Sequence, residues 1–152
     1  TDYEGLGTPS THPYLIGVSQ GRSVLDMVRG ARKLDRSLGK KVLIAGHSQG
    51  GHAALWAAAL AGRWTPELDV RGTLALAPAS HLGAQPAQLG AHAAPSPLSG
   101  LAALIVRGID VSRPQLGVAS LQTEQAQALY PQVDEACLGD LTEAASCGGL
   151  AP

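Results

Sequence analysis

The sequence predicts an α/β protein built on a parallel sheet, and three neighbouring segments carry this prediction. Residues 41–45 form a segment of strand length that is apolar through its middle, residues 49–61 are rich in helix formers, and residues 70–77 form a second expected strand, which ends at Pro78. Strand, helix and strand joined by short connections are typical of a right-handed βαβ unit. Parallel strands of this kind are expected to be buried on both faces of the sheet.

The segments before this unit predict a loop and a long helix. Residues 2–14 are dense in Gly, Pro, Ser and Thr, which is typical of a loop. Apolar residues then recur at helical spacing over residues 19–38, with Ser19 as the expected N-cap and Gly39 just beyond the expected end. By the same rule Gly62 is expected to end the helix that starts at residue 49.

The second half of the chain has a different character. Beyond Ser80 the sequence is rich in Ala, Pro and Gly, and no further alternation of strands and helices follows. Residues 101–109 are apolar and predict a helix, with a strand as the alternative, whereas residues 122–130 and 134–145 predict short helices with polar faces. The chain is therefore expected to divide into an α/β part, residues 1–80, and a mostly helical insertion or cap, residues 81–152.

Composition limits the classes of function. The chain has 152 residues, of which 45% are hydrophobic and 15% charged, so one globular domain is expected. A formal charge of -1 without a basic cluster argues against nucleic acid or an anionic membrane as the main partner. No apolar run reaches the roughly 18 residues of a membrane span. The chain begins at Thr1 without Met or a leader, which suggests a piece cut from a longer protein of unknown location.

Two cysteines, Cys137 and Cys147, lie close together in a Gly- and Ser-rich tail. No metal-ligand spacing accompanies them. The hydrolase chemistry considered below implies neither a metal nor an organic cofactor. A local disulfide and two free thiols are both compatible with the sequence.

The motif Gly46-x-Ser48-x-Gly50 lies where the first strand gives way to the helix. This is the place of a nucleophile elbow, a sharp turn that lifts a serine hydroxyl above the carboxyl end of a sheet. Gly46 and Gly50 are expected to provide the space that the turn needs, and the backbone N–H of Gln49 would be one oxyanion donor. The alternative is a Gly/Ser turn that only joins strand to helix.

Three motifs in order carry a resemblance to a known family. They are D-Y-E-G-L-G at residues 2–7, S-Q-G-R-S-V-L-D at residues 19–26 and G-H-S-Q-G-G at residues 46–51. In this order they resemble the secretory lipases of the α/β-hydrolase class, which include bacterial secreted lipases and the fungal lipase A type. The resemblance covers the first half of the chain well and implies a partial α/β-hydrolase fold followed by the start of a helical cap. It also implies a secreted protein.

Carried over by position, the resemblance makes Ser48 the nucleophile and the Gln49 N–H an oxyanion donor. His47 would shape the substrate pocket rather than act as the base. Other residues expected at the carboxyl edge of the sheet, as lining of the pocket, are Tyr3, His12, Tyr14 and His81.

The acid and the base of a catalytic triad are not evident in the sequence. In this class they follow the serine in the order acid, then histidine. Asp69 precedes its strand and should lie at the opposite edge of the sheet from Ser48. His52, on the helix after the serine, is expected to pack or cap rather than catalyse, and His92 is expected to be exposed.

Three aspartates fall in the cap-like part, and no histidine follows any of them: Asp110, Asp134 and Asp140. In the family the acid and base arrive after the cap, so we expect them beyond Pro152. The second oxyanion donor is expected before Thr1. These 152 residues alone are therefore expected to be inactive, or nearly so.

The sequence thus predicts a serine ester hydrolase, a lipase or carboxylesterase, that forms an acyl-enzyme at Ser48 with a small-molecule or lipid ester. An acyltransferase or peptidase on the same fold is the near alternative, because fold does not fix the reaction. A non-catalytic binding domain that retains the turn is a second alternative. A small complete doubly wound domain is a third, which the missing strand–helix repeat after Ser80 disfavours.

Overall fold

The computed structural model describes residues 1–84 and 94–151, which form two compact units. The first unit comprises Thr1–Ser10 and Leu15–Ser80, and the second comprises Thr11–Tyr14 and the chain from His81 onward. Residues 11–14 thus belong to the second unit, although the sequence placed them in the first part. His92 lies outside the described residues.

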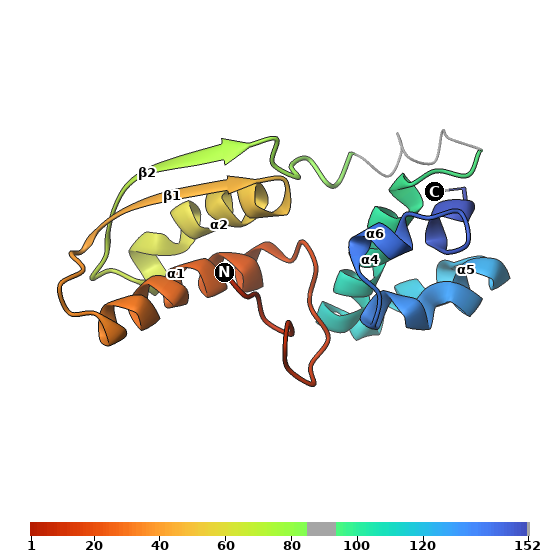
Figure 1. The fold of residues 1–152 in the computed structure, drawn as a ribbon, viewed down its shortest axis with the longest axis horizontal. Coiled ribbons are helices and arrows are strands. Elements are labelled where there is room, and N and C mark those ends of the chain that lie inside the picture. The colour runs from red at the N-terminus through yellow and green to blue at the C-terminus, as the bar shows by residue number, and fades with distance from the viewer. Residues whose placement is uncertain (85–93, 152) are drawn as a thin grey trace. The chain divides into compact units, whose positions relative to one another are not determined.

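The predicted βαβ unit forms the centre of the first unit (Figure 1). Strand β1 (Lys41–His47) leads into α2 (Gln49–Trp64), and β2 (Asp69–Leu76) returns parallel to β1. The pairing runs from Lys41 opposite Asp69 to His47 opposite Leu76, with one irregularity between Val42 and Leu43. The strand–helix–strand prediction is confirmed, and β1 continues two residues beyond its predicted end.

Helix α1 (Gly17–Leu34) starts earlier and ends earlier than the sequence predicted. Ile16, not Ser19, is the N-cap residue, and Ser19 lies inside the helix, where its hydroxyl donates to Glu4. The helix ends at Asp35, well before Gly39, because the Asp35 carboxylate accepts the Ser37 backbone N–H at 2.8 Å. A local turn of this kind competes with helix continuation.

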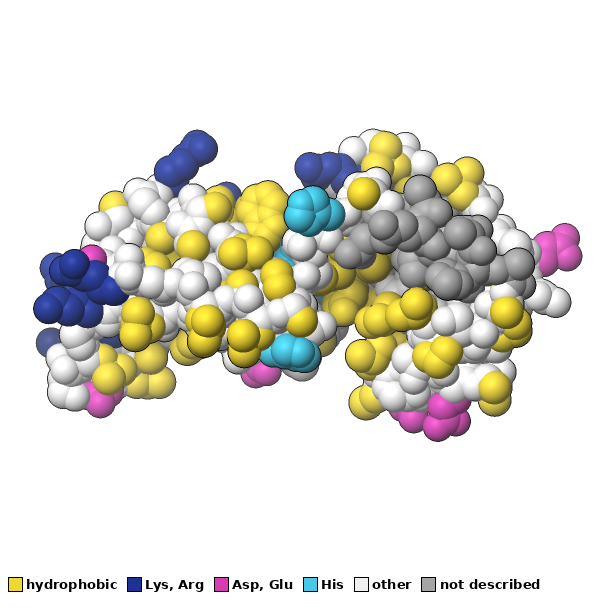
Figure 2. Space-filling view, turned by 90° about the horizontal axis from the view of Figure 1, so that it is seen from above, with side chains coloured by type: hydrophobic (Ala, Val, Ile, Leu, Met, Phe, Trp, Pro, Cys, Tyr) yellow, Lys and Arg dark blue, Asp and Glu magenta, His cyan; other side chains and the backbone are white. Residues whose placement is uncertain are grey.

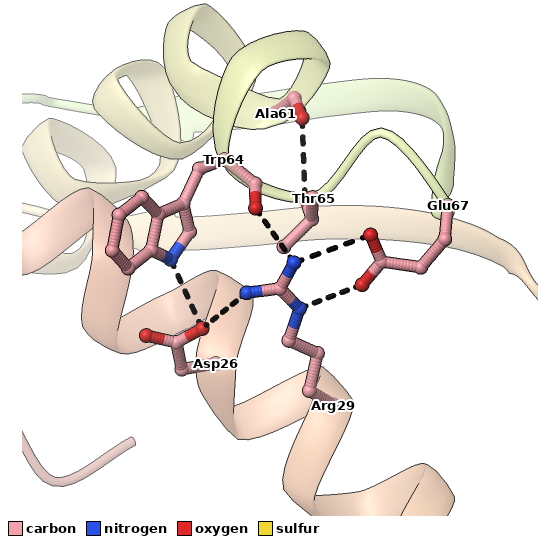
Figure 3. A network of polar contacts seen from close by, with 6 residues as sticks. All are labelled: Asp26, Arg29, Ala61, Trp64, Thr65 and Glu67. Carbon is pink, nitrogen blue, oxygen red and sulfur yellow. Dashed lines mark hydrogen bonds and ion pairs between the residues drawn. The ribbon is translucent and has the colours of Figure 1, made fainter.

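Helix α2 runs through Gly62, so the predicted stop at that glycine is wrong. Its last turn is fixed by Trp64, whose indole N–H donates to Asp26 at 3.0 Å and whose carbonyl accepts from Arg29 at 2.6 Å (Figure 3). Arg29 also binds Glu67, and this ion pair lowers the pKa of Glu67 to about 2. These contacts with α1 outweigh the weak helix propensity of one glycine.

The core of the first unit lies between one face of the sheet and the helices. Its buried members are small or branched residues of α1, β1 and α2: Leu25, Ile44, Ala54, Ala57 and Ala61. Burial alternates along β1, and the side chains that point away from the helices are open; Leu43 is 79% exposed and Leu74 of β2 is 57% exposed. Burial on both faces, which is usual for parallel strands, is not reached within residues 1–84 and 94–151, because helices α1 and α2 cover one face only (Figure 1). Hydrophobic side chains lie along the open face (Figure 2).

The second unit is helical. Its longest element, α4 (Leu98–Ser112), shows that the apolar residues 101–109 form a helix rather than a strand. No helix within the described residues is both long enough and apolar enough to cross a membrane. Short elements follow α4 in the order η1 (Pro114–Leu116), η2 (Val118–Leu121), α5 (Glu124–Leu129), η3 (Tyr130–Asp134), α6 (Leu138–Leu141) and η4 (Cys147–Gly149).

Helix α5 agrees with the prediction for residues 122–130, and Thr123 caps it by accepting the Ala126 N–H at 3.2 Å. The single helix predicted over residues 134–145 is wrong. Asp134 closes η3, and α6 starts only at Leu138, where the Asp140 carboxylate accepts the Cys137 N–H at 3.2 Å. A cap at this point sets the start of a new helix.

Both cysteines are free thiols. Cys137 is exposed, whereas Cys147 is buried in a small core with Val133 and Leu141. Of the two states that the sequence allowed, the structure therefore contains the pair of thiols and not the disulfide.

Candidate active site

Ser48 lies at a sharp turn between the last residue of β1 and the first residue of α2. We call residues 46–51 the Ser48 turn. The backbone of Ser48 has φ 53° and ψ −117°, and its side chain is exposed. A residue with a Cβ adopts such a conformation at a cost of about 1–3 kcal/mol, and it persists only where the surrounding structure holds it. The hydroxyl is thus presented outward on a strained backbone.

Close packing explains two glycines of the Ser48 turn. A Cβ added at Gly46 would collide with the carbonyl group of Gly50, so no side chain fits there. A Cβ at Gly51 would lie 2.9 Å from Leu76 O and 3.1 Å from the Cα of Pro78. At Gly50, in contrast, the nearest described atom would be the Tyr3 hydroxyl at 4.0 Å. The expectation that Gly46 and Gly50 make the space is therefore half right, since Gly51 rather than Gly50 is the second tight position.

The chain after β2 holds the Ser48 turn in place. The Ser48 N–H donates to Leu76 O at 3.0 Å, and Ser48 O accepts the N–H groups of His52 at 3.0 Å and Ala79 at 3.4 Å. Ala77, between these partners, also has a positive φ of 41°. Both backbone groups of the strained serine are thus hydrogen-bonded. No motif in the sequence predicts this support, and its one local signal is Pro78, two residues after the end of β2.

The amino end of α2 faces the same turn. Ser48 occupies the N-cap position without a capping hydrogen bond from its side chain, and Gln49 is the first helical residue. The N–H groups of a first helical turn and the helix dipole favour negative charge at this point. The arrangement can therefore stabilise an anion that develops next to the Ser48 hydroxyl.

Two of the residues predicted to line a pocket belong to the same unit as Ser48. Tyr3 is half-buried with its hydroxyl near Gly50, and burial raises the pKa of its phenol. Tyr3 and Gly50 border a hollow of about 330 Å³ beside β1. His47 is exposed at the end of β1. Their role toward a substrate stays a prediction.

The other predicted lining residues belong to the second unit. The backbone of Tyr14 packs against Gly108 of α4, its ring meets that of His12 edge-on at 6.0 Å, and burial raises the pKa of its phenol. His81 is exposed and has a φ of 55°. A pocket role for Tyr14 and His81 therefore also stays a prediction.

The candidate acids have other partners. Asp69 starts β2 opposite Lys41, at the end of the sheet away from Ser48, as expected, and it pairs with Arg71 at 2.7 Å. Asp110 and Asp134 both bind Arg107, at 3.2 and 2.6 Å, and the Asp134 carboxylate is the main reason why the pKa of Arg107 is raised. Within the described residues, no three His, Cys, Asp or Glu side chains come together as a metal site requires.

His52 has the packing role that the sequence favoured. It is 6% exposed, its ring lies 6.3 Å from that of Trp56, and its Nδ1 lies 2.7 Å from Ala79 O. Its Nε2 is buried without a hydrogen-bond partner among the described residues. It therefore links α2 to the chain that follows β2.

A strained and exposed serine between a strand and the amino end of a helix is the geometry of a nucleophile elbow. The model of the secretory lipase family matches residues 1–145. The chain belongs to the secretory lipase family. The tight glycines and the serine of the turn all lie within the matched residues.

Two curated relatives agree with this assignment. Lipase A of Moesziomyces aphidis is 32% identical over 73 residues, which cover 47% of this chain and 15% of the relative. A Mycobacterium tuberculosis protein whose name describes it as a probable inactive lipase is 33% identical over 139 residues, or 88% of this chain and 29% of the relative. The chain thus spans less than a third of the length of either relative.

Solved structures of Candida antarctica lipase A have the same fold over most of this chain. The closed state matches with a TM-score of 0.64 at 23% identity, covering 80% of this chain and 28% of the lipase. A second structure matches with a TM-score of 0.65 at 23% identity, covering 82% and 28%. At this identity the likeness shows the fold alone. The described residues of this chain form a partial α/β fold whose parallel sheet has two strands.

Proposed function

We propose that Ser48 is the nucleophile of a serine ester hydrolase. The observation that carries the proposal is the backbone of Ser48, with φ 53° and an exposed side chain directly before α2. Strain of this size in a residue at a helix start is typical of a functional site rather than of a joining turn. Membership of the secretory lipase family supports ester chemistry and an extracellular location.

In the proposed reaction the Ser48 hydroxyl attacks the ester carbonyl carbon while a histidine accepts its proton. The tetrahedral oxyanion would accept a hydrogen bond from the Gln49 N–H at the amino end of α2. The alcohol then leaves with the proton from the histidine, and water releases the acyl group from Ser48 by the same steps. We place this histidine and its acid partner outside residues 1–152, because the expected chain order cannot be met within them.

The substrate class that we propose is a small-molecule or lipid ester. In this proposal the first unit supplies the nucleophile. Tyr3 and His47, which belong to the same unit as Ser48, are proposed to line the pocket for the acyl group.

The first experiment compares Ser48→Ala with the wild type in the protein at its full natural length. We expect hydrolysis of p-nitrophenyl butyrate to fall by at least 10³-fold, because loss of a triad nucleophile removes most of the catalysis. A fluorophosphonate probe should label the wild type and not Ser48→Ala. Ser10→Ala, which removes another exposed hydroxyl of the first unit, should react like the wild type.

A second candidate function follows from the relative that is named a probable inactive lipase. The protein would then retain the Ser48 turn as part of a binding domain. The same probe separates the two functions, since an intact wild-type protein that takes up no fluorophosphonate at Ser48 contradicts the hydrolase proposal and favours the binding domain.

A further inference from the structure

Ala79 is bound to the start of α2 through both of its backbone groups. Its N–H donates to Ser48 O at 3.4 Å, and its carbonyl oxygen lies 2.7 Å from the Nδ1 of His52. His52 in turn closes the first helical turn, because its own N–H donates to Ser48 O at 3.0 Å. Three residues thus form a closed set of hydrogen bonds around the carbonyl of the candidate nucleophile.

The chemistry of the contact fixes the protonation of the imidazole. A carbonyl oxygen only accepts hydrogen bonds, so the proton of this contact must be on Nδ1. The Nε2 atom is buried and meets no hydrogen-bond partner among residues 1–84 and 94–151. A proton there would be a buried donor without an acceptor, which is unfavourable. The arrangement therefore favours the neutral Nδ1–H tautomer.

This contact bears directly on the strained serine. Ser48 keeps its positive φ because its N–H is held by Leu76 and its carbonyl by His52 and Ala79. Leu76 and Ala79 are three residues apart on the chain that leaves β2, and Gly51 allows that chain to lie against α2. The side chain of His52 binds Ala79 O and so connects α2 to the chain that follows β2.

Resting on the proposed hydrolase function, we infer that His52 is a positioning residue for the acyl transfer at Ser48. Its Nδ1–H holds residues 77–80 against the first turn of α2, so that the Ser48 hydroxyl and the Gln49 N–H keep their places relative to each other. His52 itself touches neither substrate nor reacting atoms in this role. Loss of the donor, rather than loss of the ring, is what should impair the reaction.

Two substitutions of similar size at His52 distinguish loss of the hydrogen-bond donor from loss of the imidazole ring. In His52→Asn the amide nitrogen takes the place of Nδ1 and still donates, whereas His52→Leu has the same branching without a donor. We expect kcat for p-nitrophenyl butyrate, and the rate of fluorophosphonate labelling, to fall at least tenfold in His52→Leu with KM changed less than twofold. His52→Asn should stay within threefold of the wild type.

Hydrogen exchange provides a readout that does not depend on activity. The Ala79 amide should exchange at least tenfold faster in His52→Leu than in the wild type, and should stay protected in His52→Asn. Arg29→Gln serves as the control for general destabilisation, since Arg29 binds Glu67 and the Trp64 carbonyl at the other end of α2. It should leave both the labelling rate and the exchange of Ala79 unchanged.

The outcomes distinguish this inference from the function on which it rests. If the wild type labels at Ser48 while His52→Leu labels equally fast, or while both His52 variants lose the same activity, the inference is wrong and the hydrolase proposal stands. A wild type that does not react at Ser48 overturns both. Nitrogen-15 shifts of labelled histidine that place the His52 proton on Nε2 overturn the inference alone.

Discussion

In the first unit two long helices pack on one face of a parallel sheet, whereas in the second unit short helices and 3-10 turns surround one longer helix. The first core is made mainly of small side chains such as Ala54 and Ala57, which let α2 approach closely. The second core contains Leu141, Cys147 and Val133 beside an arginine that binds two carboxylates. The stability of the first unit therefore depends on the close approach of its backbone segments, whereas that of the second unit depends on a few larger side chains and on ion pairs.

In both units an arginine binds two carboxylates, and the two arginines differ in exposure. Arg29 is 35% exposed and its partner Glu67 40%, whereas Arg107 is 23% exposed and its partner Asp110 22%. Ion pairs in contact with water contribute little, whereas pairs that are partly shielded cost more when one partner is removed. From this comparison we expect stability to fall most when a tight glycine is replaced, less when the Arg107 cluster is disrupted, and least when the Arg29 cluster is disrupted.

Gly46→Ala should have the largest effect on stability. The new methyl group would meet the Gly50 carbonyl, so β1 or α2 must shift, and we expect the free energy of unfolding to fall by about 3 kcal/mol. Urea unfolding followed by tryptophan fluorescence measures this change, because both tryptophans, Trp56 and Trp64, belong to the first unit. The control is Gly62→Ala, which adds a methyl group on α2, in the same unit, where no atom lies within 4 Å of the new group. A loss of stability as large in the control would contradict the close-approach explanation.

Arg107→Ala should have an intermediate effect, confined to the second unit. It leaves Asp110 and Asp134 without their partner and removes the guanidinium from above the Tyr130 ring, at a cost of about 2 kcal/mol. In a Cys137→Ser background, the buried Cys147 thiol should react at least tenfold faster with a disulfide reagent. The tryptophan transition should not move.

Arg113→Ala is the control for this experiment, since the Arg113 side chain is exposed and, in the part of the chain that the structure describes, binds only a backbone carbonyl. Equal reactivity of Cys147 in the two variants would show that the Arg107 cluster does not hold the second unit together.

Glu67→Gln should have the smallest effect, and one that depends on pH. The hydrogen bond from Arg29 lowers the pKa of Glu67 from the ordinary 4.5 to about 2. A lowered pKa in the folded state stabilises the protein above pH 4.5, and this contribution disappears as the pH falls through about 2. The difference in urea midpoint between the wild type and Glu67→Gln should therefore shrink between pH 5.5 and pH 2. It should also shrink in 0.5 M NaCl, because salt screens exposed pairs. A constant difference across this range would argue against the ion pair.

Sequence reasoning was most successful where a periodic pattern coincides with the core. The apolar segment of β1 and the alanines of α2 predicted the βαβ unit, because Ile44 and the alanines at helical spacing in α2 are buried in one core. Helix ends were less predictable, since Asp35 and Trp64 end or extend their helices through particular side-chain bonds. Residues 134–145 show the same limit, because one carboxylate, that of Asp140, starts a new helix inside the predicted one.

The candidate site likewise has one part that the sequence predicts and another that it does not. The motif alone identified Ser48 and the start of α2, because the spacing of glycines around a serine is a local signal. The bond between His52 and Ala79 joins residues far apart in the sequence and follows no period, so it could not be foreseen. The same holds for Gly51, whose neighbours Leu76 and Pro78 are brought to it only by the return of β2.

The open face of the sheet has a practical consequence. Leu43, Leu74 and Leu76 are all more than half exposed there, on a sheet that has only two strands among the described residues. Unpaired strand edges beside apolar side chains are a template for intermolecular pairing. Prepared by themselves, these residues would be prone to aggregate, and lysine substitutions at Leu43 or Leu74 are the first remedy for anyone who wishes to keep them in solution.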